Sequence, residues 1–185
     1  MKPPVPVAVF ASGGGTNLQA LLDHEPVSGE YRVAMVLSDR KGATALERGL
    51  SVSRDAYVIE TDARSLTDVG RQMLERLADH DVQVILLAGY LKMIPPAVVA
   101  AYERRILNIH PALLPNFPGA HAHRDALAAG VSESGCSAHL VDEGVDTGPI
   151  ILQQPVEVLP NDTEESLAAR ILPHEHRLLA EAVRL

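Results

Sequence analysis

Short apolar runs rich in β-branched residues alternate with helical patterns along the first 110 residues of this chain. The strongest runs are Val5–Ala11, Tyr31–Ser38 and Val82–Ala88. The third, VQVILLA, is almost continuously apolar, which is typical of a central parallel strand covered on both faces. Strands that alternate with helices in this way predict an α/β fold, a doubly wound and mostly parallel sheet with helices on both faces.

The remaining segments complete the alternation. A weak strand is expected at Tyr57–Glu60 and another strand at Ile106–Ile109, with helices at Thr16–Asp23, Ala43–Leu50, Ser65–Asp79 and Pro95–Tyr102. Beyond residue 110 the pattern predicts a helix at Arg124–Ala129, strands at Ser137–Val141 and Ile150–Val158 with some antiparallel pairing, and a helix from Glu164 capped by Asp162 or Thr163. An interior proline costs a helix about 3 kcal/mol, so we expect this helix to end at Leu172 and a second to begin at Pro173. We expect one domain, 1–185, with a nucleotide-binding-like half, 1–110, and a second half, 111–185.

Composition narrows the classes of partner. The net charge is −8 and aromatic residues make up 3% of the chain, so we expect no nucleic-acid partner, which would favour a basic face and stacking aromatics. No apolar stretch approaches the ~20 residues of a membrane helix, so we expect no membrane partner. The single cysteine, Cys136, leaves no partner for a disulfide within the chain and fits a reducing compartment. We expect a cytoplasmic protein, and the sequence leaves open whether it is a monomer or a homodimer.

The first predicted strand leads into a glycine loop, Ser12–Asn17, and then into a helix. Glycines let the backbone approach a ligand closely, and a helix N-terminus offers free N–H groups to an anion. The loop lacks the Gly-Lys-Ser/Thr of a Walker A motif, and Leu18 stands where a dinucleotide fingerprint has its third glycine. A phosphate site and a plain strand–helix turn both remain open for this loop.

Asn108 and His110 lie two positions apart near the end of a predicted strand, so their side chains share one face. The carboxyl ends of parallel strands are where ligands bind in α/β sheets. An amide can donate to a developing oxyanion, and an imidazole can transfer protons near neutral pH. The pair therefore predicts a catalytic site, with a capping Asn and a structural His as the alternative.

The acidic loop Asp142–Gly148 lies between the last two predicted strands. Asp146 could face His110 and stabilise its protonated form. Asp and Gly also dominate ordinary turns, and for this loop taken alone a solvated turn is the favoured interpretation.

Four histidines, His110, His121, His123 and His139, raise the hypothesis of a metal site. His121 and His123 are two apart in a loop, and no HExxH motif or carboxylate triad accompanies them, so we expect no catalytic metal. His139 alternates with Ser137 and Val141 on one strand face, and it could line the pocket or be a half-buried structural residue.

The order of these motifs carries more information than any one of them. Ser-Gly-Gly-Gly-Thr-Asn at 12–17, Asn-Ile-His-Pro-Ala-Leu-Leu-Pro at 108–115, Phe-Pro-Gly at 117–119 and Asp-Glu-Gly-Val-Asp-Thr-Gly-Pro-Ile at 142–150 together resemble the phosphoribosylglycinamide formyltransferase family. The resemblance covers nearly the whole chain. It implies the formyltransferase fold with a Rossmann-like N-terminal half, glycinamide ribonucleotide as substrate and 10-formyltetrahydrofolate as formyl donor in purine biosynthesis, with no metal required.

The resemblance also implies roles for residues. The catalytic trio would be Asn108, His110 and Asp146. The substrate phosphate and ribonucleotide would be held by Gly15, Thr16, Asn17 and Glu175. The folate would be bound by Arg64, Leu91, Lys92, Met93, Ile94 and Asn108, and by the loop residues Asp142, Glu143, Gly144, Val145 and Asp146.

Three alternatives stay open beside this interpretation. Methionyl-tRNA formyltransferase is similar around 108–115, but it carries an RNA-binding domain for which 185 residues leave no room. Formyltetrahydrofolate hydrolase shares the Asn/His/Asp centre, but it has an extra N-terminal regulatory domain and lacks the substrate phosphate loop. A non-catalytic nucleotide-binding module would use the glycine loop alone.

Overall fold

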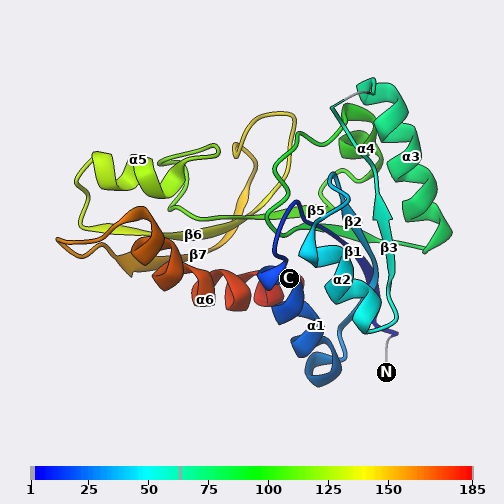
Figure 1. Ribbon diagram of the computed structural model, residues 1–185, viewed down its shortest axis with the longest axis horizontal. Coiled ribbons are helices and arrows are strands. Elements are labelled where there is room, and N and C mark those ends of the chain that lie inside the picture. The colour runs from blue at the N-terminus through cyan, green and yellow to red at the C-terminus, as the bar shows by residue number, and fades with distance from the viewer. Residues whose placement is uncertain (1–2, 63, 185) are drawn as a thin grey trace.

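The computed structural model describes residues 3–62 and 64–184 and shows an alternating α/β chain with a distinct C-terminal part (Figure 1). The first five strands are β1 (Val5–Phe10), β2 (Tyr31–Ser38), β3 (Asp55–Val58), β4 (Val84–Leu87) and β5 (Ile106–His110). The helices between them are α1 (Thr16–Ser28), α2 (Thr44–Ser51), α3 (Leu66–Asp79) and α4 (Pro96–Ala101). The rest comprises α5 (Ala122–Ala128), β6 (Glu133–Leu140), β7 (Ile150–Glu157) and α6 (Glu164–Ala182).

The strands form one seven-stranded sheet in the order β3-β2-β1-β4-β5-β6-β7. β1 to β5 pair in parallel, whereas β6 is antiparallel to β5 and β7 is antiparallel to β6. The predicted fold class is therefore confirmed, including the antiparallel pairing near the C-terminus. The strand order reverses at β1, between β2 and β4, and a crevice at such a reversal is where open α/β sheets bind ligands.

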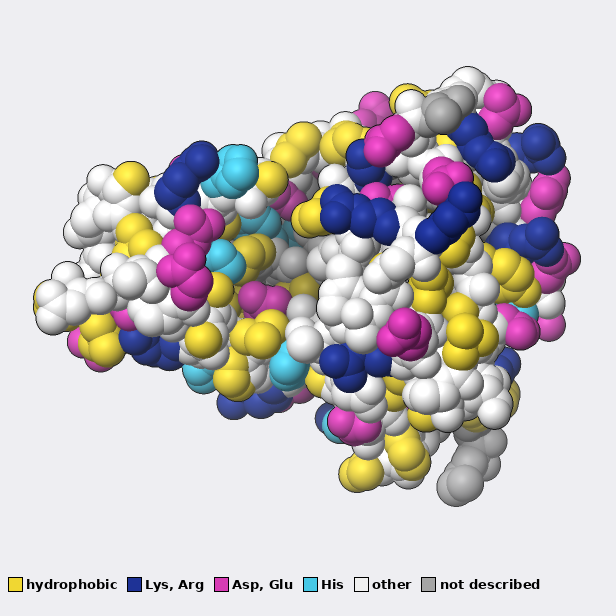
Figure 2. Space-filling model, viewed as in Figure 1, with side chains coloured by type: hydrophobic (Ala, Val, Ile, Leu, Met, Phe, Trp, Pro, Cys, Tyr) yellow, Lys and Arg dark blue, Asp and Glu magenta, His cyan; other side chains and the backbone are white. Residues whose placement is uncertain are grey.

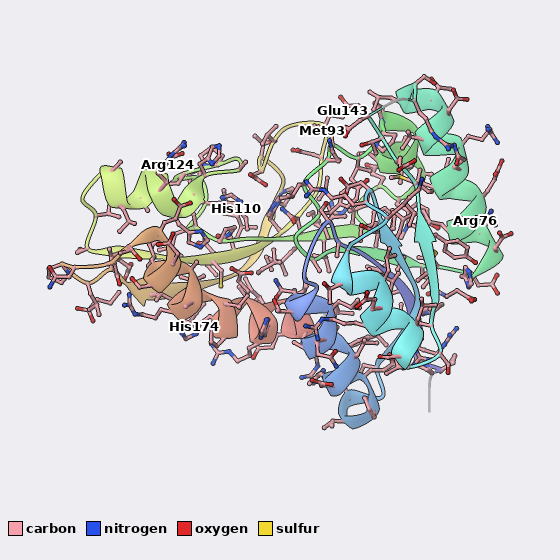
Figure 3. All side chains as sticks on the ribbon, viewed as in Figure 1. Arg76, Met93, His110, Arg124, Glu143 and His174 are labelled. Carbon is pink, nitrogen blue, oxygen red and sulfur yellow. The ribbon has the colours of Figure 1, made fainter. Side chains whose placement is uncertain are left out.

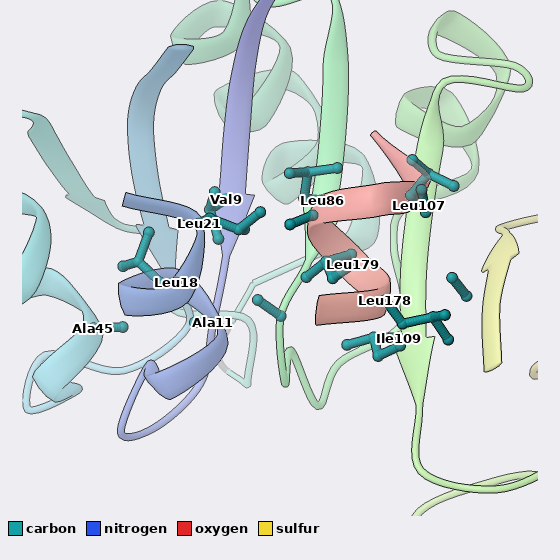
Figure 4. Close-up of a cluster of buried hydrophobic side chains, with 14 of the residues drawn as sticks. Val9, Ala11, Leu18, Leu21, Ala45, Leu86, Leu107, Ile109, Leu178 and Leu179 are labelled. Carbon is teal, nitrogen blue, oxygen red and sulfur yellow. The ribbon is translucent and has the colours of Figure 1, made fainter. Parts of the chain in front are cut away.

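Each face of the sheet has its own apolar core. One core gathers side chains of α1, α2 and α6, and the other gathers side chains of α3 and α4. Figure 4 shows the first core, where Leu18 and Leu21 of α1 and Leu179 of α6 approach Val9 and Leu86 of the sheet. These side chains are almost fully buried, and each contributes about 1.5–3 kcal/mol through burial. The helices thereby fix the carboxyl ends of β1, β4 and β5 relative to one another.

The predicted break in the last helix is wrong, because α6 continues through Pro173 instead of ending at Leu172. Pro173 is exposed, so its ring lies on the solvent side of the helix. The missing N–H and the local clash cost about 3 kcal/mol. Burial of the opposite face, which includes Leu167 and Leu178, offsets that cost. Thr163, one of the two expected caps, begins the helix and accepts the backbone N–H of the third helical residue.

Other elements also differ from their predicted bounds, most clearly β6, which begins at Glu133 rather than Ser137, and two elements nearer the N-terminus. β3 covers Asp55–Val58 rather than Tyr57–Glu60, in parallel register with the end of β2. α1 continues five residues past Asp23 to Ser28, and Gly29, with a left-handed φ of 64°, caps its C-terminus.

Candidate active site

The glycine loop joins β1 to α1 and is anchored at both ends. Ser12 donates its N–H to the carbonyl oxygen of Gly89 at 3.0 Å, and its hydroxyl accepts the N–H of Leu91 at 2.9 Å. Gly15 has a left-handed φ of 68°, and a Cβ there would lie 2.8 Å from Cα of Ala45. Only glycine fits at this position. The loop that follows β1 is thus joined directly to the loop that follows β4.

Asn17 and Glu175 meet beside the start of α1. The side-chain amide nitrogen of Asn17 donates to the carboxylate of Glu175 at 2.9 Å, and the amide oxygen, Oδ1, is buried without a partner in the described residues. Glu175 is 9% exposed, and burial raises the pKa of its carboxyl group, although the bond from Asn17 opposes that shift. The structure therefore brings Glu175 to the glycine loop, as the resemblance implies, and Pro173 does not displace it.

Asn108 and His110 project from the same face of β5, as predicted from their spacing, and both approach Asp146. The amide nitrogen of Asn108 donates to Oδ1 of Asp146 at 3.3 Å, and Nδ1 of His110 lies 3.4 Å from Oδ2. Nε2 of His110 donates to the carbonyl oxygen of Phe117 at 2.8 Å. Both ring nitrogens of His110 therefore face an acceptor, an arrangement that is fully satisfied when the imidazole is protonated on both.

His139 completes this cluster from the neighbouring strand. It is paired with Asn108 in the β5–β6 register and is 2% exposed. Its Nε2 lies 3.0 Å from the amide nitrogen of Asn108 and 3.4 Å from Oδ1 of Asp146. Its Nδ1 donates to the carbonyl oxygen of Leu140 at 2.9 Å, which fixes the ring. The structure thus places His139, buried and hydrogen-bonded, against the predicted catalytic residues.

Asp146 is the hub of the cluster and is held as a carboxylate. The hydrogen bond with His139 lowers the pKa of Asp146 to about 2, helped by the N–H of Gly119 at 2.8 Å and by the charges of His110 and His139, while burial opposes the shift. Asp146 has a left-handed φ of 53°, which Asp tolerates better than most residues. A Cβ at Gly148 would lie 1.9 Å from the carbonyl oxygen of Leu140, so this glycine is needed for the turn.

The rest of the acidic loop forms an ordinary turn. Asp142 accepts the N–H of Gly144 at 3.0 Å and the hydroxyl of Thr147 at 2.7 Å, which is the turn chemistry expected of Asp. Glu143 and Val145 are exposed at the tip. Asp142, Gly144 and Thr147 thus form the ordinary turn that one interpretation predicted, whereas Asp146 faces His110 as the other predicted. The two interpretations therefore apply to different residues of the same loop.

The stretch after β4 divides into exposed and buried positions. Leu91 and Met93 are 66% and 56% exposed, whereas Ile94 is buried in the core beneath α3 and α4. The ammonium of Lys92 pairs with Asp62 at 2.5 Å and lowers the pKa of that carboxyl group. Figure 2 shows the molecule hollowed between its two halves, with histidine, acidic and apolar side chains along the hollow. Figure 3 shows His110 beneath this region, with Met93 and Glu143 at its upper rim in the same view.

Arg64 is not joined to the other predicted site residues. It is exposed just before α3, and its guanidinium donates to Gln72 at 2.7 Å. No hydrogen bond or ion pair connects it with another predicted site residue in the part of the chain that the structure describes.

Sequence reasoning missed two backbone groups that contact the cluster. The carbonyl group of Phe117 bonds His110, and the N–H of Gly119 bonds Asp146. Phe117 and Gly119 both have left-handed φ values, 53° and 89°. Phe-Pro-Gly at 117–119 was recognised as a motif but received no role, because backbone contacts of this kind leave no side-chain signature.

Within residues 3–62 and 64–184, no group of three or more His, Cys, Asp or Glu side chains is placed to hold a metal ion. None of the helices in these ranges has the length and apolar character needed to cross a membrane.

Comparisons with known proteins point in one direction. The sequence profile of the family described as "Formyl transferase" matches residues 5–183. The phosphoribosylglycinamide formyltransferase of Mycobacterium tuberculosis (strain H37Rv) is 41% identical over 97% of this chain and 84% of its own length. The trifunctional purine biosynthetic protein adenosine-3 of Drosophila pseudoobscura pseudoobscura is 42% identical over 97% of this chain, which spans only 13% of that relative's length. The crystal structure of glycinamide ribonucleotide transformylase 1 from Symbiobacterium toebii superposes with a TM-score of 0.96 at 45% identity, covering 100% of this chain and 88% of that one.

Proposed function

This chain belongs to the formyl transferase family, and from that premise we propose that it transfers a formyl group from 10-formyltetrahydrofolate to the amine of glycinamide ribonucleotide, a step of purine biosynthesis. One observation carries the proposal. Asn108, His110 and Asp146 meet within hydrogen-bonding reach at the end of β5, on the sheet edge that also bears the glycine loop after β1.

The glycine loop takes the phosphate of the ribonucleotide. Gly15, Thr16 and Asn17 form the start of α1, where free N–H groups and the positive end of the helix dipole favour an anion. Glu175, bonded to Asn17, is positioned beside this site to accept a hydrogen bond from the substrate. A small anionic substrate is thereby bound by a protein with a net charge of −8, because the recognition is local.

The chemistry follows from the charges around the cluster. The substrate amine attacks the formyl carbon, and the bond from that carbon to the folate nitrogen breaks after a tetrahedral oxyanion has formed. Asn108 and doubly protonated His110 donate to the oxyanion and lower its energy. The oxyanion takes over the donor that Asn108 now directs at Asp146 at 3.3 Å. His110 gives one proton to the departing folate nitrogen, and the neutral imidazole that results takes up the proton lost by the amine, so the ring ends in the state in which it began.

Asp146 keeps His110 oriented and charged, or positions a water molecule that relays the proton. Its pKa of about 2 ensures that it is a carboxylate at any physiological pH. The carboxylate lies 3.4 Å from Nδ1 of His110 and faces its N–H, which holds the ring in one orientation.

The folate occupies the hollow between the loops after β4 and β6. Leu91 and Met93 are large, apolar and exposed, which suits a flat ring system. Val145, at the tip of the acidic loop, offers a third exposed apolar surface. We also place the reaction in the cytoplasm, since the only cysteine, Cys136, is fully buried as a free thiol.

A spectroscopic assay of folate deformylation, run with and without glycinamide ribonucleotide, tests the proposal. We expect deformylation only when the acceptor is present, with one formylated product formed per folate consumed. Equal deformylation without the acceptor would assign the chain to the hydrolases instead. Binding of the ribonucleotide with no deformylation under any condition would make it a non-catalytic module.

A further inference from the structure

Arg48 of α2 reaches back to the glycine loop. Its Nε donates to the carbonyl oxygen of Gly14 at 2.7 Å, and its Nη1 donates to the side-chain oxygen of Gln19 in α1 at 3.0 Å. One turn earlier on α2, the N–H of Ala45 donates to the carbonyl oxygen of Gly13 at 3.1 Å. Two successive carbonyl groups of the loop are therefore held by the same helix, which also packs against α1 through Ala45 (Figure 4).

These contacts determine where the loop N–H groups point. In a planar trans peptide the C=O and the following N–H point in opposite directions. Since the carbonyls of Gly13 and Gly14 face α2, the N–H groups of Gly14 and Gly15 face away from it. Neither N–H has a hydrogen-bond acceptor among the residues that the structure describes. Together with the first N–H groups of α1, they form a concave array of donors suited to an anion.

The glycine loop cannot hold this arrangement by itself. Gly13 and Gly14 have no neighbouring atom within 4 Å of where a Cβ would lie, so no side chain packs against them from that side. Glycine has the largest backbone freedom of any residue, and the peptide between Gly14 and Gly15 can rotate unless it is bonded. A donor array that must be ordered on binding loses affinity relative to one that is already fixed.

We infer that Arg48 is a positioning residue for phosphate recognition, because it fixes the Gly14–Gly15 peptide with its N–H directed at the phosphate of the ribonucleotide. The inference deepens the proposed function and rests on it. Arginine suits the task because its rigid fork bonds the loop and Gln19 at once. A lysine ammonium is a single point of charge on a flexible stem, and it cannot reproduce both bonds in one fixed geometry.

Steady-state kinetics of Arg48→Met, Arg48→Lys and the matched control Arg71→Met test the role. Arg48→Met keeps an apolar stem and loses the donors, so we expect the KM for glycinamide ribonucleotide to rise about tenfold or more, with kcat and the folate KM nearly unchanged. Arg48→Lys should recover part of the loss, because its ammonium can still donate to Gly14. Arg71 is exposed on α3 and pairs only with Glu75, so its replacement should change none of the three constants. A ribonucleotide KM within twofold of wild type in Arg48→Met, or an equal rise of both KM values, would overturn the inference.

A second measurement separates this inference from the proposed function, because it needs no turnover. Inorganic phosphate is titrated into ¹⁵N-labelled protein while the amide resonances of Gly14 and Gly15 are followed by NMR. We expect both to shift in the wild type and in Arg71→Met, and to respond at about tenfold higher phosphate in Arg48→Met. If phosphate shifts the Gly14 and Gly15 resonances but the protein transfers no formyl group, the proposed activity is refuted, and Arg48 remains the residue that orders an anion site. Identical titrations in wild type and Arg48→Met would refute the role of Arg48 whatever the activity.

Discussion

Asn17 and Glu175 share a hydrogen bond of 2.9 Å although 158 positions separate them in the chain. The bond joins the start of α1 to the middle of α6, and it places a carboxyl group beside the glycine loop. Glu175 is 9% exposed, and its surroundings supply one amide donor and no cation among the contacts described. A carboxyl group buried with so few partners lowers the stability of the protein, and a role in binding a ligand would account for its presence.

The variant Glu175→Gln should separate the stability cost of the buried carboxyl group from its role in binding the substrate. Burial raises the pKa of Glu175 above its ordinary value of 4.5, so the native state binds this proton more tightly than the unfolded chain does. Native stability therefore falls as the pH rises above 4.5, and the loss is complete above the native pKa. Thermal unfolding should show a higher Tm for the variant than for wild type at pH 8, and a gap that narrows toward pH 4.5.

The same variant should bind the ribonucleotide less well. We expect its KM for glycinamide ribonucleotide to rise about tenfold, because a charge-assisted hydrogen bond to the substrate is lost. Glu181→Gln, exposed on the same helix, is the control and should alter neither Tm nor KM. An unchanged KM in Glu175→Gln would remove Glu175 from the proposed substrate site.

His110→Ala should lower turnover by at least about 10², the scale of general acid–base assistance. His121 is exposed at the start of α5, and His121→Ala is the matched control. Both variants should keep the wild-type far-UV circular dichroism, and kcat/KM for the ribonucleotide is the quantity to compare. Full activity in His110→Ala would refute the proposed mechanism.

The variant Asp146→Asn should remove the part of the acid dependence of stability that Asp146 contributes. The pKa of Asp146 lies at about 2 in the native state, below its ordinary value of 3.8, so its contribution is present above pH 3.8 and is lost as the pH falls to 2. The lowering corresponds to about 2 kcal/mol. Urea unfolding should show wild type more stable than the variant by about that amount at pH 7, with little difference near pH 2. Asn tolerates the left-handed φ of this position, which limits the change to the charge.

Asp142→Asn provides the control for that experiment, because Asp142 lies in the same loop but is exposed and bonds only within the turn. Its acid unfolding should follow the wild type. If the two variants behave alike, Asp146 has no special electrostatic role.

Whether the sequence predicted a contact in this site depends on how far apart its two partners lie along the chain. The two-residue period of a strand is local, so it was enough to place Asn108 and His110 on one face of β5. The position of Asp146 against His110 depends on a loop after β6, and the sequence alone favoured a solvated turn there. The contact of Arg48 with Gly14 was not predicted, since it requires α2 to pack against the loop after β1.

The prediction of a helix break at Pro173 is wrong for a related reason. Helix propensity is a local quantity, whereas the burial of Leu167 and Leu178 is decided by the sheet and α1. Tertiary burial therefore outweighed the local cost of the proline. The resemblance implied that Glu175 contacts the substrate, which no local pattern could have given, and its hydrogen bond with Asn17 is seen only in the structure.

Replacement of the two exposed apolar residues after β4 should weaken the binding of folate and leave the binding of the ribonucleotide unchanged. Leu91 and Met93 contribute little to the core, so the double substitution Leu91→Ser, Met93→Ser should change the free energy of unfolding by no more than about 0.5 kcal/mol per residue. The folate KM should rise about tenfold or more, because apolar area is no longer buried against the ring. Leu66→Ser, at a residue 56% exposed on α3, is the control and should leave the folate KM unchanged. A rise in the ribonucleotide KM alone would place the folate elsewhere.

Gly14→Ala and Gly15→Ala should differ in kind, although the two glycines are adjacent. A Cβ at Gly15 would lie 2.8 Å from Cα and Cβ of Ala45 on a left-handed backbone, so Gly15→Ala should lower Tm and lose activity toward both substrates. A Cβ at Gly14 meets nothing within 4 Å, so Gly14→Ala should keep the wild-type Tm. The added methyl group would nevertheless crowd the exposed loop where the phosphate is proposed to bind. We therefore expect Gly14→Ala to raise the ribonucleotide KM while the folate KM stays constant, and an unchanged ribonucleotide KM would argue that the phosphate does not approach this loop.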